Sequence, residues 1–303
     1  MRARVKWMTS LAAAAASLAV VAGCTSAPGG PKPVVTVTAV STVTAAPSPE
    51  PSDTASATPE PTPVFNPFER PDWLHTQELK KNKKNGMGPP LPTPPELEDR
   101  QLEPRPTYLP DPETDEWFVE ITKVPQHALE RSSWSKKCPV KVADLAYVVM
   151  PYWGFDNKPH TGEMLIAKRY AKKVASVFEY MYEVRFPIEE MRITSDAEVN
   201  GTHHGDLNVT IAFECRSTTG AFTAWSQHAY GTALDINPFH NPWRREPYVF
   251  PEMATSYLDR TNVRRGMIES HPEIVKKFEE IGWYWGGYWT RLDDWMHFSH
   301  NNL

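Results

Sequence analysis

Proline limits what this chain can fold into more than any other residue. The 303 residues include 30 prolines and only 15 glycines, and each proline removes a backbone donor and interrupts helices and central strands. Because prolines are dense from about residue 28 to residue 137, that stretch is a poor candidate for packed core. We therefore expect one sizeable domain, placed toward the C-terminus, rather than two.

The N-terminus has the features of an export signal. Basic residues among the first six precede an apolar run at 11–21, and the small residues Ala22 and Gly23 stand directly before Cys24. This order resembles a bacterial lipoprotein signal. We expect residues 1–23 to be removed and Cys24 to carry lipid, which would anchor the protein to the outside of the bacterial cell membrane. The alternative is an ordinary signal peptide beside a chance cysteine; a spanning helix is disfavoured, because about 20 apolar residues cross a bilayer.

Two proline-rich segments follow. Residues 24–65 are rich in Pro, Ser and Thr and lack large apolar side chains, a composition typical of a disordered, extended tether. Residues 66–137 add aromatic side chains and a basic run at 80–84. This arm could be an extended segment on the domain, a small subdomain or further disorder, and periodicity does not decide. The basic run is typical of a solvated face.

From residue 138 to 303 the pattern becomes that of a packed domain. Apolar residues recur at helical spacing over 170–184 and again over 274–281, where Pro272 suits the first turn. Strands are expected at 145–152, 162–166, 191–193, 210–215, 234–237, 282–285 and 296–298. Because few strands alternate with helices, the expected fold is α+β, with a mainly antiparallel sheet and flanking helices.

The net charge limits the expected binding partners, and the cysteine content limits the expected disulfides. The formal net charge of -5 has no basic excess, so nucleic acid is not expected as a partner. Apart from Cys24, the cysteines are Cys138 and Cys215, which are a candidate disulfide outside the cytoplasm. Their spacing does not show that they meet. We expect a monomer.

One stretch, SQHAYGTALDINPFHNP, stands out at residues 226–242. Gly231 allows a tight turn, so that His228 before it and Asp235 on the strand after it can converge. Such a pair either only fixes the turn or binds a metal. A catalytic zinc site needs a third protein ligand, and DDWMHFSH supplies His297. Asp294 in the same octapeptide is a candidate general base.

These motifs resemble the zinc D-alanyl-D-alanine carboxypeptidase family. The segment from Ser226 to Ile236, with the distal His-Phe, carries the likeness, and GFDNKPHTGEM, FPIEEMR, AFECR, YLDR and GWYWGGYW follow in the order of one branch. The family includes vancomycin-resistance D,D-peptidases and phage L-alanyl-D-glutamate endopeptidases, and it shares its fold with hedgehog proteins. Gln227 stands where Asn is common and Ser299 where an acid is frequent; neither is a ligand position.

The resemblance implies a role for each matched residue. His228, Asp235 and His297 match the zinc ligands, Asp294 the general base, Arg216 the residue that steadies the substrate carbonyl, and Ser226 a cleft residue. The histidines His203 and His204 in the loop NGTHHGD are expected at the surface. The other histidines match no functional residue of the family.

The implied function is that of a zinc-dependent peptidase for peptidoglycan stem peptides. The bond could be D-Ala-D-Ala at the stem terminus or L-Ala-D-Glu within it. The alternative is a non-catalytic lipoprotein that binds the cell wall through a hedgehog-like zinc domain. Asp294 and Arg216 favour the enzyme, because a binding module needs no carboxylate beside a metal.

Overall fold

The computed structural model describes residues 65–80, 82, 86–219 and 224–303, all within one compact unit. The signal peptide, Cys24 and nearly all of the tether lie outside these residues. Within the described part, no helix is long and apolar enough to cross a membrane.

The longest strands form an antiparallel sheet of β1 (Glu120–Thr122), β2 (Leu145–Trp153) and β3 (Pro159–Ala167), in that order. β2 and β3 are a hairpin that pairs Leu145 with Ala167 at one end and Trp153 with Pro159 at the other. Both strands are buried along almost their whole length, although β3 includes the polar residues His160, Thr161 and Glu163.

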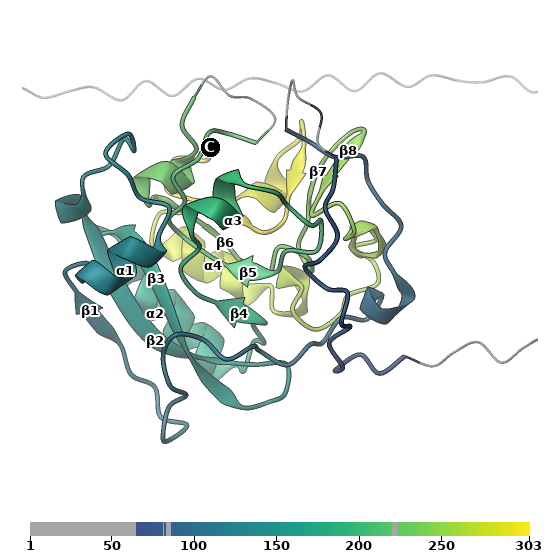
Figure 1. The fold of residues 1–303 in the computed structure, drawn as a ribbon. Helices are drawn as coiled ribbons and strands as arrows, with labels where there is room; N and C mark the ends of the chain where they lie inside the picture. The colour runs from purple at the N-terminus through teal and green to yellow at the C-terminus, as the bar shows by residue number, and fades with distance from the viewer. Residues whose placement is uncertain (1–64, 81, 83–85, 220–223) are drawn as a thin grey trace, which may run out of the picture. The chain divides into compact units, whose positions relative to one another are not determined.

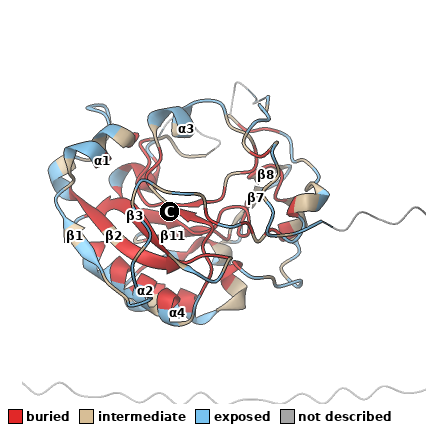
Figure 2. Cartoon of the chain, turned by 60° about the horizontal axis from the view of Figure 1, so that its bottom comes forward, coloured by how far each residue is buried: buried red, intermediate tan, exposed pale blue. Residues whose placement is uncertain are grey.

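Two amphipathic helices cover this hairpin. The apolar face of α2 (Ala171–Glu183) packs with that of α4 (Glu273–Glu280) in one core with β2, β3 and the C-terminal aromatic residues. Figure 2 shows the inner faces of both helices buried below the strands. Helical periodicity therefore located both helices correctly, and Pro272 is the N-cap of α4.

Shorter strands complete the fold. A second antiparallel sheet has the order β6 (Ala233–Asp235), β11 (His297–Ser299), β9 (Tyr284–Trp285), and a third has the order β10 (Asp293–Asp294), β7 (Trp243–Arg245), β8 (Tyr248–Phe250). Only β4 (Glu190–Met191) and β5 (Val209–Thr210), among the described strands, pair in parallel. The expected α+β fold with mainly antiparallel sheets is confirmed.

The remaining elements are short. The helices are α1 (Gln126–Arg131), α3 (Asp196–Asn200) and the 3-10 turns η1 (Pro95–Leu97), η2 (Val142–Asp144), η3 (Gln227–Tyr230), η4 (Thr255–Leu258), η5 (Ile268–Ser270) and η6 (Gly286–Tyr288).

The strand expected over 210–215 ends early, at Thr210. Beyond it the backbone finds partners outside a regular ladder: Ile211 bridges to Asp235, Glu214 donates to the His228 carbonyl, and Cys215 donates to Ser133 Oγ. The segment that carries Arg216 is thus held by the turn that carries His228.

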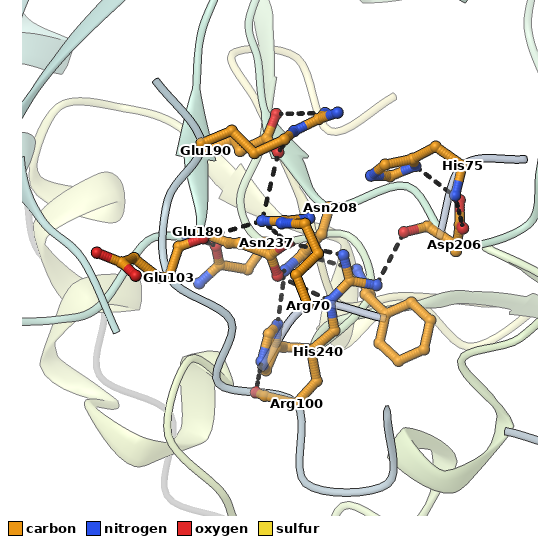
Figure 3. Close-up of polar contacts among 12 residues, drawn as sticks. Arg70, His75, Arg100, Glu103, Glu189, Glu190, Asp206, Asn208, Asn237 and His240 are labelled. Atoms are coloured by element: carbon orange, nitrogen blue, oxygen red, sulfur yellow. Dashed lines mark hydrogen bonds and ion pairs between the residues drawn. The ribbon is translucent and has the colours of Figure 1, made fainter. Parts of the chain in front are cut away.

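The described part of the arm is integrated into the domain (Figure 1). Leu97 and Leu102 are fully buried in a second core with Phe239 and Tyr257. Arg100 is also fully buried, and its Nε and one terminal nitrogen each lie 2.7 Å from a carboxylate oxygen of Glu189. Figure 3 shows Arg100 and Arg70 of the arm converging on Glu189. The arm therefore contributes core residues despite its prolines.

Candidate metal centre

Three of the predicted residues come together where η3, β6 and β11 meet. His228 lies in η3, Asp235 ends β6, and His297 begins β11 directly opposite Asp235 in the strand register. Gly231 ends η3 with φ +65°, and a Cβ there would lie 2.7 Å from the Ala167 nitrogen. Glycine is therefore required both for the turn and for its close approach to β3.

The ligand atoms of these residues suit a small tetrahedral ion. They all lie within 4.8 Å of one another. His297 Nδ1 is 3.0 Å from Asp235 Oδ1 and 3.3 Å from His228 Nε2, which is 3.2 Å from Asp235 Oδ2. Zinc bonds of about 2.0 Å in tetrahedral geometry would separate ligand atoms by about 3.3 Å. Two imidazoles and one carboxylate at this spacing fit a zinc ion.

The far nitrogen of each imidazole is held by a main-chain oxygen. His228 Nδ1 lies 2.7 Å from the Ala212 oxygen, and His297 Nε2 lies 3.0 Å from the Leu303 oxygen. Because a carbonyl can only accept, each of these ring nitrogens must donate its hydrogen. The nitrogens that face Asp235 are then the ones free to bind a metal.

The pKa values of Asp235 and His297 depend on the charged groups around them. Burial alone would raise the pKa of Asp235, but His228 and His297 hold it well below its usual value. Burial alone would lower the pKa of His297, but the hydrogen bond to Asp235 and the charge of Asp294 raise it. A metal cation between these ligand atoms would supply positive charge next to Asp235.

Asp294 is a carboxylate on which the charges of His297 and Asp235 act. Its Oδ1 is buried and makes no hydrogen bond to any described residue, and burial, with the charge of Asp235, raises its pKa to about 7. A Cβ at Gly286 would lie 2.6 Å from the main-chain oxygen of Asp294, so glycine allows the two segments to approach this closely. The adjacent Asp293 instead pairs with Arg244 through Nε at 2.8 Å. Asp294 is therefore a candidate for proton exchange near neutral pH.

Arg216 is oriented beside the metal ligands. Its Nε donates to Glu214 Oε2 at 2.7 Å, one terminal nitrogen donates to Thr219 Oγ1 at 3.2 Å, and the other lies 3.8 Å from Asp235 Oδ2. Burial alone would lower the pKa of Arg216, but Glu214 and Asp235 raise it. Arg216 is thus a fixed cation next to the cluster.

A cavity of about 620 Å³ opens beside the cluster. Asp235, Arg216 and Met296 line one part of it, and His75, Met87 and Arg105 of the arm line another. Its size is that of a site for a small molecule or a peptide end. The arm therefore lines a cavity that reaches Asp235, one of the candidate ligands.

The other predicted residues have clear positions. Ser226 is buried, and its Oγ accepts a hydrogen bond from the His228 nitrogen at 3.3 Å. It thereby caps the turn that positions a ligand, and its role toward a substrate stays a prediction. Cys138 and Cys215 form a disulfide with a Cα separation of 5.7 Å. His203 and His204, expected at the surface, also line the cavity, and His203 pairs with the buried Glu252 at 2.7 Å.

Several groups that support the site escaped sequence analysis. The Ala212 and Leu303 oxygens orient the two imidazoles, and Glu214 orients Arg216. Main-chain oxygens carry no signal in a sequence, because every residue has one. Glu214 lies in the quoted motif AFECR, two positions before Arg216, and that proximity was the one usable signal.

Residues 219–300 match the model of the D-alanyl-D-alanine carboxypeptidase family. The matched segment includes His228, Asp235, Asp294 and His297, and Arg216 lies just before it. The expected resemblance is therefore confirmed, and it supports a peptidase. No curated protein and no solved structure matches the chain.

Proposed function

We propose, from the match of residues 219–300 to D-alanyl-D-alanine carboxypeptidases, that this protein is a zinc-dependent hydrolase of peptidoglycan stem peptides. One observation carries the proposal. Three ligand atoms converge at zinc-like spacing next to a carboxylate oxygen that has no partner in the described structure. A structural zinc site is usually closed by four protein ligands, whereas a catalytic one has three.

His228, Asp235 and His297 would hold the zinc. When bound, zinc polarises a carbonyl and lowers the pKa of a coordinated water to about 7. Asp294 would accept a proton from the attacking water and deliver it to the leaving amine, and in the metal-free protein burial and the charge of Asp235 raise its pKa to about 7. A carboxylate with an ordinary pKa would hold that proton too weakly to deliver it near neutral pH.

Arg216 supplies positive charge for the reacting carbonyl. Negative charge grows on the carbonyl oxygen as the carbon becomes tetrahedral, and a fixed donor there stabilises the transition state. Glu214 and Thr219 hold the guanidinium, so little reorganisation is needed when the charge develops. The cavity lined by Arg216 and Asp235 would accept the substrate peptide.

The N-terminal region suggests where the substrate lies. Lipid on Cys24 would anchor the protein to the outer face of the cell membrane, and residues 24–65 would extend the domain toward the wall. This location suits the cell-wall peptides of the proposed reaction. Replacing Cys24 with Ser should release the protein from membranes or leave the leader uncleaved, and a variant that fractionates like the wild type would disprove lipidation.

The second candidate function is a wall-binding lipoprotein without turnover. The buried, unpaired Asp294 oxygen argues against it, because leaving such a group without a partner destabilises the fold and binding alone does not require it.

Digestion of purified muropeptides by the full-length protein, with products weighed by mass spectrometry, tests the proposal. Loss of one terminal alanine identifies a D,D-carboxypeptidase, and separation of the stem after L-Ala identifies an endopeptidase. Asp294→Asn is the matched inactive control and Asp293→Asn the matched active one. A wild type that binds peptidoglycan as Asp294→Asn does, yet cleaves no stem, would support the binding module instead.

A further inference from the structure

The last residues of the chain fold back onto the imidazole of His297. The Leu303 nitrogen donates to Ser299 Oγ at 3.1 Å, and the Leu303 oxygen lies 3.0 Å from His297 Nε2. Asn302 has φ +59°, which turns the chain, and its side-chain oxygen accepts from Trp289 Nε1 at 2.7 Å. Two hydrogen bonds thus hold the C-terminal turn, and a third joins the Leu303 oxygen to His297 Nε2.

This contact decides which nitrogen of His297 carries hydrogen. The Leu303 oxygen has no hydrogen to donate, so the 3.0 Å contact requires a hydrogen on Nε2. A neutral imidazole has only one such hydrogen, and Nδ1 is then left with its lone pair. Nδ1 is the nitrogen that lies beside Asp235 and His228. The C-terminal turn therefore aims the metal-binding nitrogen at the cluster.

The two histidines obtain this orientation from different parts of the molecule. The oxygen that holds His228 belongs to Ala212, a residue with 0% exposure. The oxygen that holds His297 belongs to Leu303, a residue with 67% exposure. Trp289 reinforces the exposed contact, because its ring centre lies 5.5 Å from that of His297 while its Nε1 holds Asn302.

We infer that Asn302 and Leu303 form a positioning segment for the metal, which fixes the Nε2–H form of His297 and raises zinc affinity. The inference rests on the proposed zinc site and extends it to residues outside the segment that matches the peptidase family. Groups that hold the far nitrogen of a metal-binding histidine typically contribute 10- to 100-fold in affinity. Removing the segment should weaken zinc binding by about that factor.

The test compares full-length variants by competition with a chromophoric zinc chelator. Deletion of residues 302–303 should weaken zinc binding about 10- to 100-fold. Trp289→Phe keeps an aromatic ring but removes the donor to Asn302, and should weaken zinc binding in the same direction by less. Asn301→Ala, the matched control, alters an exposed neighbouring side chain and should bind zinc like the wild type.

Nitrogen NMR of His297 shows which ring nitrogen carries the hydrogen, and a simple loss of stability would not change that result. In the neutral ring of the folded, zinc-free wild type, the hydrogen should lie on Nε2, and in the deletion variant both forms should be populated. A deletion variant with wild-type zinc affinity and an unchanged Nε2–H form would overturn the inference. If the wild type binds no zinc, the proposed function fails, and the ring form still decides the role of the segment.

Discussion

Two groups of buried ionisable residues are linked by the short segment from Asp235 to His240, and they differ in how their charges are balanced. In the arm cluster, Arg100 and Glu189 share two hydrogen bonds of 2.7 Å, and Asn208 Nδ2 donates to Glu189 at 2.6 Å. His240 stays neutral there, because burial lowers its pKa to about 3. The charges of Arg100 and Glu189 are therefore balanced against each other within the protein.

The metal group, which consists of His228, Asp235, His297 and Asp294, lacks such a balance. Asp235 lies within 3.2 Å of the imidazoles of His228 and His297, and Asp294 has an oxygen without a described partner. A buried group left in this state is costly unless a ligand completes it. The difference teaches that buried charge alone does not identify a functional site; the unbalanced cluster is the better candidate.

The largest expected effect is on turnover. Asp294→Asn removes the proposed base but keeps the shape of the side chain, so turnover of stem peptides should fall about 10²- to 10⁴-fold. Zinc content and the unfolding temperature should be retained, because Asp294 is not a ligand. Asp293→Asn is the control, and it should keep most activity, because Asp293 pairs with Arg244 at the edge of the site. Equal loss in both variants would refute the assignment of the base.

The arm cluster should respond through stability. Arg100→Ala leaves the fully buried Glu189 without its main partner, and breaking a buried pair costs about 3–5 kcal/mol. Denaturant unfolding measures the loss. Lys276→Ala removes an exposed pair with Glu273 and should leave unfolding unchanged. A small effect of Arg100→Ala would mean that the arm is dispensable for the fold.

Arg216→Ala should reduce turnover with zinc retained. Loss of one donor to the developing oxyanion costs about 3 kcal/mol, or about 100-fold in turnover. Arg216→Lys keeps the charge but not the fork held by Glu214 and Thr219, so its activity should lie between those of Ala and the wild type. Loss of zinc from Arg216→Ala would instead assign Arg216 to metal binding.

Acid should weaken the arm cluster gradually. Burial lowers the pKa of His240 to about 3, so the unfolded chain binds a proton below about pH 6.5 that the folded chain excludes. Burial alone would raise the pKa of Glu189, but Arg100 lowers it to about 2, so its contribution is present above about pH 4.5 and is lost below. Each group changes stability by at most about 1.4 kcal/mol per pH unit.

Unfolding free energy measured across this range checks the sign. Stability of the wild type should fall from about pH 6.5 downward. In His240→Gln the decline should be shallower above about pH 4.5, because His240, unlike Glu189, contributes to the decline in that range. An equally steep decline in both proteins would exclude His240 as its source.

The sequence predicted those parts of the fold and site that repeat or stand in a motif. Helical periodicity located α2 and α4, and the strands expected at 145–152 and 162–166 correspond to β2 and to the second half of β3. The order of His228, Gly231 and Asp235 indicated convergence, because glycine permits the turn. His297 was a candidate because a catalytic zinc site needs a third protein ligand, and the resemblance then matched it to that role.

What the sequence could not predict depends on contacts between distant residues. The docking of the arm rests on Arg100, which meets Glu189 from 89 positions away, and prolines gave no sign of a buried arginine. The strand expected over 210–215 is replaced by contacts to His228 and Ser133. The orientation of His297 by Leu303 involves a main-chain oxygen and therefore leaves no trace in residue type.

The central claim is that the unbalanced cluster binds zinc. Elemental analysis of the purified full-length protein and its single-ligand variants tests it most directly. We predict stoichiometric zinc in the wild type and strongly reduced zinc in His228→Ala, Asp235→Ala and His297→Ala, with excess zinc raising the unfolding temperature of the wild type alone. Undiminished zinc in all three variants would contradict the account.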